Sequence, residues 1–237
     1  MVPHITFATI LADLDARLAA IPTRNTASVR RMRRTISRDL RGSPKEFIRA
    51  VAFALTARDA EFDRFIAAEL IAAHPQALKC LSQSDVRRLG RGMNSWGDVD
   101  VFACILSGPA WRIGRLTDAE LRRWARSADR WWRRAAVVST VPLNNRARGG
   151  TGDSARTLML CREVVADRDP MVVKALSWAL RELAKRDAGP VREFLATHRT
   201  VLPALVRREV RTKLVTGRKA APPRRRPAAR LLSEREN

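Results

Sequence analysis

The sequence predicts an all-α protein, folded as a curved α-solenoid of HEAT-like antiparallel helix pairs. Apolar residues recur at helical spacing along nearly the whole chain, and Ala, Leu and Arg dominate its composition. No stretch alternates apolar and polar residues between turn signals, as a strand would. Helix pairs joined by short turns bury their core between neighbouring repeats and leave a long concave face. The repeats are expected to be structural, because no clean sequence period is present.

Proline, glycine and polar residues mark the expected helix boundaries, and the helices between them should span roughly 10 to 17 residues. The expected breaks lie near Ile21-Pro22, Gly42–Pro44, His74-Pro75, Gly90–Asn94, Gly108-Pro109, Val141–Asp153, Asp169-Pro170, Gly189-Pro190 and Leu202-Pro203.

We expect one folded domain over residues 1–217 and a basic disordered tail over residues 218–237. The chain has 237 residues, of which 46% are apolar, enough for one core or a short stack of repeats. The tail is rich in Pro and Arg and poor in core-forming residues. It carries +5 of the net charge of +22, so the folded part keeps +17.

This charge predicts a polyanionic partner, with double-stranded DNA as the first candidate. An anionic membrane surface is the alternative, but no apolar run approaches the ~20 residues of a spanning helix. Asp13 and Asp15 lie where a signal peptide would be apolar. We therefore expect a soluble, cytoplasmic, nucleoid-associated monomer with no membrane partner. Seven arginines between Arg24 and Arg41 form either a solvated helix face or a phosphate-tracking patch.

The cysteines give no sign of a metal site or a cofactor. Cys80, Cys104 and Cys161 are widely separated, form no C-x-x-C pair and have no histidine at ligand spacing. The glycine cluster near Gly150 lacks the Lys-Ser/Thr of a phosphate-binding loop. We expect neither a metal nor a cofactor, and we interpret the cysteines as buried or incidental.

A helix expected from about Pro170 to Arg186 carries one tryptophan outside its apolar arc. Trp178 lies instead among Lys174, Arg181 and Lys185. It is either packed under a neighbouring helix with basic stems around it, or it contacts a sugar or base while the cations contact phosphates. The apolar arc consists of Val172, Leu176, Ala179, Leu180 and Leu183.

The segment SWGDVD places a carboxylate beside an indole. Ser95 is the expected N-cap and Asp98 the acidic end of a capping box, which leaves Asp100 without a local role. Asp100 lies one turn beyond Trp96 and could line a concave pocket, although a salt bridge would explain it equally well. The same strip continues through Ala103, Cys104 and Ser107, and the opposite apolar side consists of Val99, Phe102 and Leu106.

In the segment DRWWRRAAVVS, Arg134 borders a core stripe of Trp131, Ala135 and Val138, and Arg133 points further out. Either arginine could contact phosphate or remain solvated. Trp111 and Trp124 are expected in the core.

Taken in order, SWGDVD, WWRRAAVVS and KALSWALRELAKRD resemble the signature segments of the AlkD-like DNA alkylation-repair family, which are HEAT-like-repeat alkylpurine DNA glycosylases. LVRREVRTKL resembles the C-terminal helix of that family, so the resemblance covers Trp96 to about Gly217. It implies a basic concave groove that holds duplex DNA, and hydrolysis of the N-glycosidic bond of N3- and N7-alkylated purines. The chain differs from the family pattern in its first ~90 residues, in having no tyrosine, and in a longer loop from Asn144 to Asp153.

The resemblance also implies residue roles. Trp96 and Trp178 match two tryptophans that pack against the deoxyribose at the lesion, and Asp100 matches the catalytic aspartate. Arg134 matches an arginine that contacts the DNA backbone, and Arg181 a further phosphate contact. The other expected DNA-binding residues are Arg133, Lys174, Lys185, Arg207, Arg208 and Lys213.

One carboxylate suffices for this reaction in principle, because a cationic alkylpurine departs as a neutral base without a general acid. The carboxylate would stabilise the oxocarbenium-like sugar and orient water, and the indoles would add cation–π attraction. Glycosidases that act on neutral sugars use two carboxylates. The alternative is a catalytically inactive module that binds bent or branched DNA through the same groove and does not need Asp100.

Overall fold

The structure, a computed structural model, describes residues 6–58 and 60–219. Within these ranges it is helical, with no strand, so the all-α prediction is confirmed. Shorter helical turns span Leu78–Cys80, Phe102–Ser107 and Arg146–Arg148. The α-helices are α1 (Phe7–Ala19), α2 (Thr26–Asp39), α3 (Lys45–Arg58), α4 (Asp63–Ala73), α5 (Gln83–Leu89), α6 (Trp96–Val101), α7 (Gly108–Arg112), α8 (Asp118–Ala125), α9 (Arg130–Val138), α10 (Val141–Asn144), α11 (Ser154–Glu163), α12 (Pro170–Leu183), α13 (Ala188–Thr197) and α14 (Ala204–Thr216).

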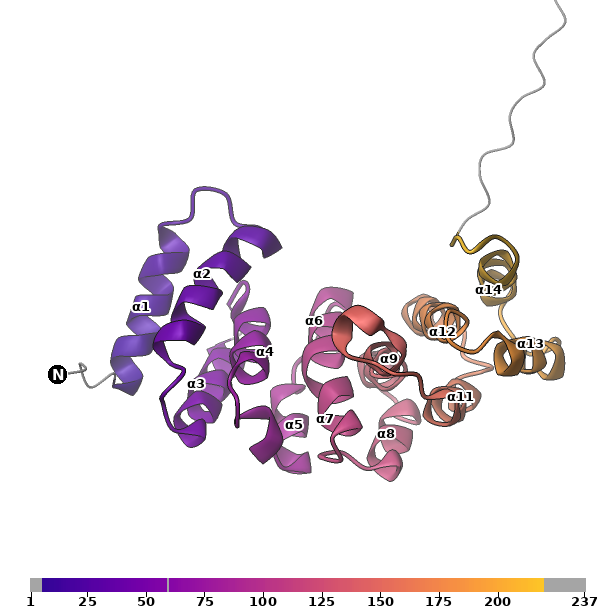
Figure 1. The fold of residues 1–237 in the computed structure, drawn as a ribbon, viewed down its shortest axis with the longest axis horizontal. Coiled ribbons are helices and arrows are strands. Elements are labelled where there is room, and N and C mark those ends of the chain that lie inside the picture. The colour runs from indigo at the N-terminus through magenta and orange to yellow at the C-terminus, as the bar shows by residue number, and fades with distance from the viewer. Residues whose placement is uncertain (1–5, 59, 220–237) are drawn as a thin grey trace, which may run out of the picture.

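The helices stack side by side along an arc that runs from α1 to α14 (Figure 1). An inner row, on the concave side of the arc, consists of α2, α4, α6, α9, α12 and α14, and each of these helices packs against the next. An outer row contains α3, α5, α8, α11 and α13. The inner row therefore supplies the side chains of the concave face. The HEAT-like character of the helix pairs stays a prediction.

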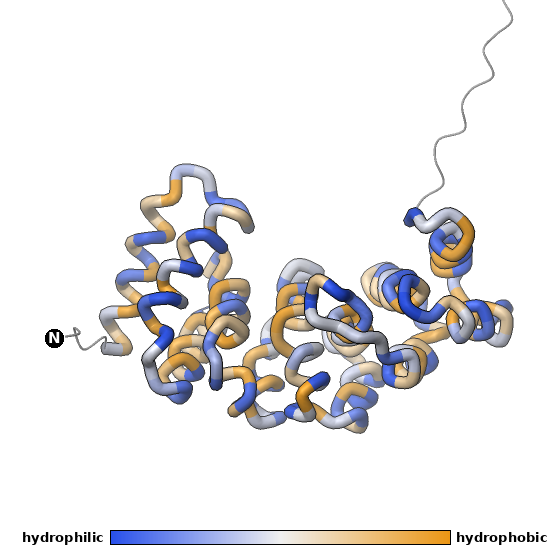
Figure 2. Tube along the Cα trace, viewed as in Figure 1, coloured by the Kyte–Doolittle hydropathy of each residue, from blue (hydrophilic) through white to orange (hydrophobic). Residues whose placement is uncertain are grey.

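The core is one continuous cluster of buried apolar residues that extends through the stack. Apolar and polar stretches alternate along the helices (Figure 2), as is typical of amphipathic helices that pack on one side only. The predicted apolar arc of α12 is confirmed, because its five residues are fully buried. Trp111 and Trp124 are buried as predicted, and their indole N–H groups donate to Asp118 and Glu120.

Local sequence signals fix most helix starts. Asp169 accepts a hydrogen bond from the Met171 N–H and Pro170 occupies the first turn of α12, where a missing N–H costs no helical bond. Asp129 and Thr117 cap α9 and α8 in the same way. The predicted helix lengths are too long for part of the centre of the chain, where α5 and α8 have 7 and 8 residues.

The predicted break at Gly108-Pro109 is wrong. The chain remains helical from Trp96 to Arg112, because a π-helical segment over Phe102–Ser107 leads directly into α7. Pro109 lies at the start of α7, where the helix does not require its N–H. Two further boundaries move. Helix α12 ends at Leu183 and not near Arg186, and Pro190 lies inside the first turn of α13.

Helix α14 ends at Thr216, next to the predicted domain boundary. Residues 220–237 lie outside the described residues, so the disorder of the tail and the extent of the domain stay predictions. Within the described ranges, no helix is long and apolar enough to cross a bilayer.

Candidate active site

Two of the candidate residues, Asp100 and Arg134, form an ion pair with two hydrogen bonds. Asp100 lies on α6 and Arg134 on α9. The Nε and Nη2 groups of Arg134 donate to Oδ1 and Oδ2 of Asp100 at 3.0 and 2.9 Å. The Nη1 group donates to the carbonyl oxygen of Met171 on α12 at 2.6 Å. One guanidinium therefore connects three neighbouring helices of the inner row, and the salt bridge that could explain Asp100 is present.

The ion pair of Asp100 and Arg134 is largely shielded from solvent. The Arg134 residue is 5% exposed, and the Asp100 side chain is 20% exposed. Burial raises the pKa of Asp100 above its ordinary value, while the hydrogen bonds and the charge of Arg134 act in the opposite direction. An arginine has only donors, so the two-bond pairing requires the ionised carboxylate.

The π-helical segment directly after α6 changes which residues share a face with Asp100. The sequence predicts a strip of small residues that continues from Asp100 through Ala103, Cys104 and Ser107. Cys104 lines the same cavity as Asp100, as predicted. Ala103 and Ser107 are instead fully buried, and Ser107 forms a hydrogen bond with Ser139 at 2.6 Å. A π-turn contains more residues per turn than an α-helix, so it rotates later side chains away from the expected strip. The prediction is therefore wrong for Ala103 and Ser107.

Trp96, Trp178 and Asp100 line a common cavity of about 590 Å³ on the inner face. Trp96 is the first residue of α6 and is 62% exposed, whereas Trp178 on α12 is half-buried. A second cavity of about 460 Å³ is lined by Arg134, Lys174 and Arg181. The two cavities share only Trp96 and Trp178 among their lining residues. The two tryptophans thus border both cavities.

Two of the expected DNA-binding cations on α12 reach the second cavity. Lys174 is exposed, and Arg181 is half-buried beside Glu209 of α14, with 3.5 Å between Nε and Oε2. Burial lowers the pKa of Arg181. Lys185 is not on the helical face that the sequence predicts, because α12 ends at Leu183, and its Nζ binds Glu182 at 2.7 Å.

The remaining expected contacts are not at this site. Arg133 lines neither cavity, and its guanidinium binds Asp167 at 2.7 Å and the backbone carbonyls of Ser127 and Ala128. These hydrogen bonds of Arg133 connect two loops. Its contact with DNA stays a prediction.

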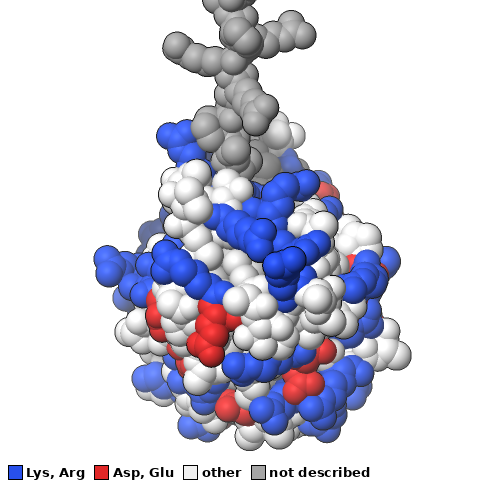
Figure 3. Space-filling view, turned by 90° about the vertical axis from the view of Figure 1, so that its right-hand side faces the viewer, with Lys and Arg blue, Asp and Glu red and all other residues white. Residues whose placement is uncertain are grey.

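Helix α14 carries the last three expected contacts. Arg208 is exposed, Arg207 donates to the Arg199 carbonyl, and Lys213 donates to the carbonyl of Gly217. Lys and Arg predominate over Asp and Glu on the face at this end of the molecule (Figure 3). A role for these three residues in DNA binding stays a prediction.

The sequence leaves two roles open for the arginines of α2, a solvated helix face or a patch that contacts phosphates, and the individual arginines differ. Arg33 is buried and binds Glu69 of α4 at 2.6 and 2.9 Å, so it is structural. Arg30 also binds Glu69, but it lines the cavity at Asp100. Arg34 is exposed and lines a third cavity, of about 650 Å³.

The N-terminus of α6 differs in one detail from the expected capping box. Ser95 accepts a hydrogen bond from the N–H of Asp98 at 3.1 Å, as predicted. The Asp98 carboxylate accepts from the Ser95 hydroxyl at 2.8 Å instead of from its backbone N–H. Asp98 therefore has a capping role, and Asp100 does not.

Sequence reasoning missed other residues of the Asp100 cavity. Phe62 lines it from the loop before α4, with a left-handed φ of 67°, which is uncommon for a residue other than glycine. Arg148 lines it from the loop before α11. Arg148 has no sequence neighbour at helical spacing in this cavity. Phe65, three residues after Phe62, also lines it, but Phe62 precedes α4 and lies outside the helical periodicity.

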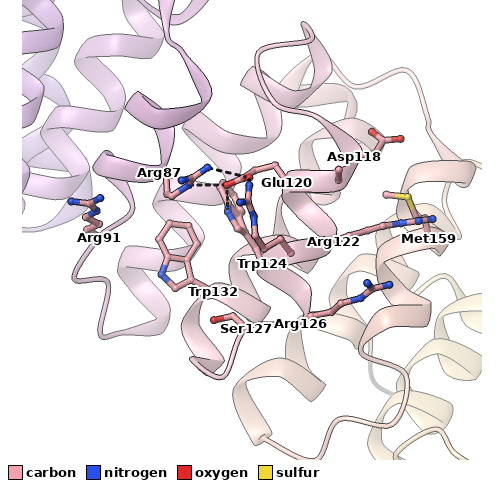
Figure 4. Close-up of a pocket in the computed structure, with 12 residues that line it drawn as sticks. Arg87, Arg91, Asp118, Glu120, Arg122, Trp124, Arg126, Ser127, Trp132 and Met159 are labelled. Atoms are coloured by element: carbon pink, nitrogen blue, oxygen red, sulfur yellow. Dashed lines mark hydrogen bonds and ion pairs between the residues drawn. The ribbon is translucent and has the colours of Figure 1, made fainter.

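A larger cavity of about 990 Å³, shown in Figure 4, shares no lining residue with those at Asp100. Two carboxylates line it, Asp118 and Glu120. Asp118 accepts hydrogen bonds from Trp111 and Arg156. Glu120 is fully buried and accepts hydrogen bonds from Gln83, Arg87 and Trp124. These bonds, together with an ion pair to Arg123, occupy both oxygens of Glu120. Glu120 is therefore structural, and neither Trp96 nor Trp178 lines this cavity.

The fold and the site define an all-α protein with an arginine-bound carboxylate beside two tryptophans on a basic inner face. The family model described as DNA alkylation repair enzyme matches residues 23–214. The chain belongs to this family, as its sequence motifs predict. A search among curated proteins gives no match. The match includes residues 23–95, where the motifs alone showed little resemblance.

Proposed function

We propose that the protein is a DNA glycosylase that hydrolyses the N-glycosidic bond of positively charged N3- or N7-alkylated purines in duplex DNA, as a step of base excision repair. The supporting observation is the position of Asp100. Its carboxylate lines a cavity together with Trp96 and Trp178, and Arg134 holds it in a fixed orientation.

The proposed chemistry is electrostatic. The cationic base leaves as a neutral molecule, with the electrons of the C–N bond, and a positive charge develops on the sugar. Asp100 stabilises this charge and orients the water that attacks the anomeric carbon. The faces of Trp96 and Trp178 add cation–π attraction to the same charge. Partial burial of Asp100 and Trp178 strengthens their interactions relative to water.

Arg134 acts in this proposal mainly as a positioning residue. Three of its five N–H groups are used by Asp100 and by the Met171 carbonyl. Two N–H groups remain for a backbone phosphate, which agrees with the role that the family motif implies. Lys174 and Arg181 line the neighbouring cavity and are the proposed phosphate anchors on that side.

One observation favours the alternative of an inactive DNA-binding module. The pair between Asp100 and Arg134 gives Asp100 a structural role without any reaction. The two functions differ in product. A glycosylase releases free 7-methylguanine or 3-methyladenine from methylated duplex DNA, whereas the inactive module binds that DNA and releases neither base. Chromatography of the small-molecule fraction after incubation with the purified protein distinguishes them.

A further inference from the structure

The loop between α10 and α11 projects an arginine toward the candidate active site. It contains the 3-10 turn Arg146–Arg148, and the family resemblance marks it as longer than expected. None of the residues to which the proposed function assigns a role lies in this loop. Arg148 nevertheless lines the same cavity as Asp100, Trp96 and Trp178.

Two arginines hold the backbone of this loop in place. Arg112 donates to the carbonyl oxygen of Arg148 at 2.8 Å. Arg186 donates to the carbonyls of Asn144 and Gly150 at 2.8 and 2.6 Å. Hydrogen bonds from charged donors are stronger than those between neutral groups. The loop is therefore fixed at its start, at its tip and at its end.

Glycines make this path of the chain possible. Gly149 has a left-handed φ of 74°, which follows the 3-10 turn at no steric cost. A Cβ on Gly150 would clash with the carbonyl oxygen of Pro142. The loop thus packs too closely against α10 for any larger residue at position 150, and this close packing fixes the position of Arg148.

The side chain of Arg148 has no partner of its own in the structure. It is exposed, and within residues 6–58 and 60–219 its guanidinium forms no hydrogen bond or ion pair. It also lines the third cavity, opposite Arg30 and Arg34 of α2. The neighbouring thiol of Cys104 offers no negative charge, because burial raises its pKa to about 12. The carboxylates of Asp100 and Glu69, which line these cavities, pair with other arginines. The charge of Arg148 is therefore available to an anion that comes from outside the protein.

We propose that Arg148 binds a backbone phosphate of the DNA strand that lies against Asp100, on the side of the tryptophan pair away from Lys174 and Arg181. This inference rests on the proposed function in taking DNA as the ligand. The strand would then be held by phosphate contacts from two cavities that share only Trp96 and Trp178. Arg112 and Arg186 are positioning residues for this contact.

The test compares Arg148→Ala with Arg146→Ala in the full-length protein. Arg146 is an exposed arginine of the same 3-10 turn that lines neither cavity, so it controls for the loss of one charge. Binding is measured by fluorescence anisotropy on a duplex with a tetrahydrofuran abasic-site analogue, across a series of salt concentrations. This DNA cannot be cleaved at a glycosidic bond, so the result does not depend on excision.

We expect Arg148→Ala to weaken binding about tenfold, as for loss of a hydrogen bond to a charged group. The slope of log affinity against log salt should fall by about one. Arg146→Ala should change the affinity by less than about twofold, since a solvated charge away from the strand contributes little. Circular dichroism should be unchanged for both variants, because neither truncation removes a side-chain bond. Equal weakening by the two variants, or none by Arg148→Ala, overturns the proposal.

Neutral methylphosphonates placed singly near the abasic analogue locate the contact. At one position, the substitution should weaken binding by the wild type and have no further effect on Arg148→Ala. If every position affects both proteins equally, Arg148 contacts no particular phosphate and the inference is wrong. A wild type that binds this duplex but releases no methylated base would instead contradict the proposed glycosylase, and the Arg148 comparison would remain decisive.

Discussion

Two nitrogens of the Arg134 guanidinium on α9 each donate a hydrogen bond to a different carboxylate oxygen of Asp100 on α6, at 3.0 and 2.9 Å. The two residues that the family motifs associate with the reaction are thus one structural unit. Any substitution in one of them changes the surroundings of the other. The effects of a substitution on rate, binding and stability therefore have to be measured separately.

Replacing Asp100 by Asn should reduce excision of 7-methylguanine by ~10²–10³, the usual contribution of a preorganised electrostatic group. Affinity for DNA should stay near that of the wild type. The free energy of unfolding should change by less than about 1 kcal/mol, because the raised pKa of Asp100 means that the fold accommodates an uncharged side chain here at least as well as the carboxylate. Single-turnover excision well below the melting temperature measures the rate.

Asp98→Asn is the matched control for this experiment. Asp98 lies two residues earlier on the same helix and binds Ser95. Its substitution should cost about 1 kcal/mol through the weakened helix start, and excision should remain close to that of the wild type. Loss of excision in Asp98→Asn but not in Asp100→Asn would assign the reaction to the wrong carboxylate.

Arg134→Lys keeps the positive charge but cannot bind both oxygens of Asp100 and the Met171 carbonyl in the same planar geometry. We expect the excision rate of bound DNA to fall about tenfold or more, together with a loss of about 1–3 kcal/mol in stability. Any loss of DNA affinity should be the same for different sequences, since phosphate contacts carry no sequence information. If affinity falls and the rate of the bound complex does not, Arg134 is a phosphate anchor only.

Acid should affect excision and stability in opposite directions at Asp100. Burial raises the folded-state pKa of Asp100, so the folded state binds this proton more tightly than the unfolded state does. The contribution of protonated Asp100 to the free energy of unfolding is therefore greatest below the pKa of the unfolded state. It is lost as pH rises through the pKa of the folded state. Excision needs the ionised form and should rise over the same window.

Single-turnover rates and melting temperatures across this acid range, for the wild type and for Asp100→Asn, measure both effects. The acid limb of the excision profile should be absent from Asp100→Asn. An identical limb in both proteins would show that another group controls it.

The two tryptophans should differ in their contribution to stability. Trp96→Ala removes a ring that is 62% exposed, so the free energy of unfolding should change by less than about 0.5 kcal/mol. Trp178→Ala removes a half-buried ring that packs against the core and should cost about 2 kcal/mol. Both should lower excision about tenfold, as expected for a lost cation–π contact. Chemical denaturation and single-turnover kinetics on the same samples compare them, and normal excision by Trp96→Ala would remove this residue from the proposed sugar contact.

Truncation after Gly217 should leave a folded protein that binds duplex DNA. Helix α14 ends at Thr216, so its helical residues all remain. The remaining charge of +17 should make the affinity fall steeply as salt rises, through release of counterions. Binding titrations at several salt concentrations test this prediction. A truncated protein with intact helical content and no DNA binding would exclude binding on the inner face.

Periodicity predicted the parts of this protein that depend on near neighbours in the sequence. The buried arc of α12 and the position of Trp178 outside it follow from helical spacing alone. The pair between Asp100 and Arg134 joins residues 34 positions apart, so no local pattern could identify it. The π-helical segment after α6 has no residue signature in the sequence, and for that reason Ala103 and Ser107 were placed on the wrong face.

The bonds of Arg134 give the inner face a mechanical property. This one side chain joins α6, α9 and α12, which are consecutive members of the inner row. The spacing of these helices sets both the local curvature of the arc and the orientation of the Asp100 carboxylate. Bending the array to follow a duplex and aligning the carboxylate with a sugar are therefore coupled movements. A DNA that the arc cannot follow would also be a DNA against which Asp100 is misaligned.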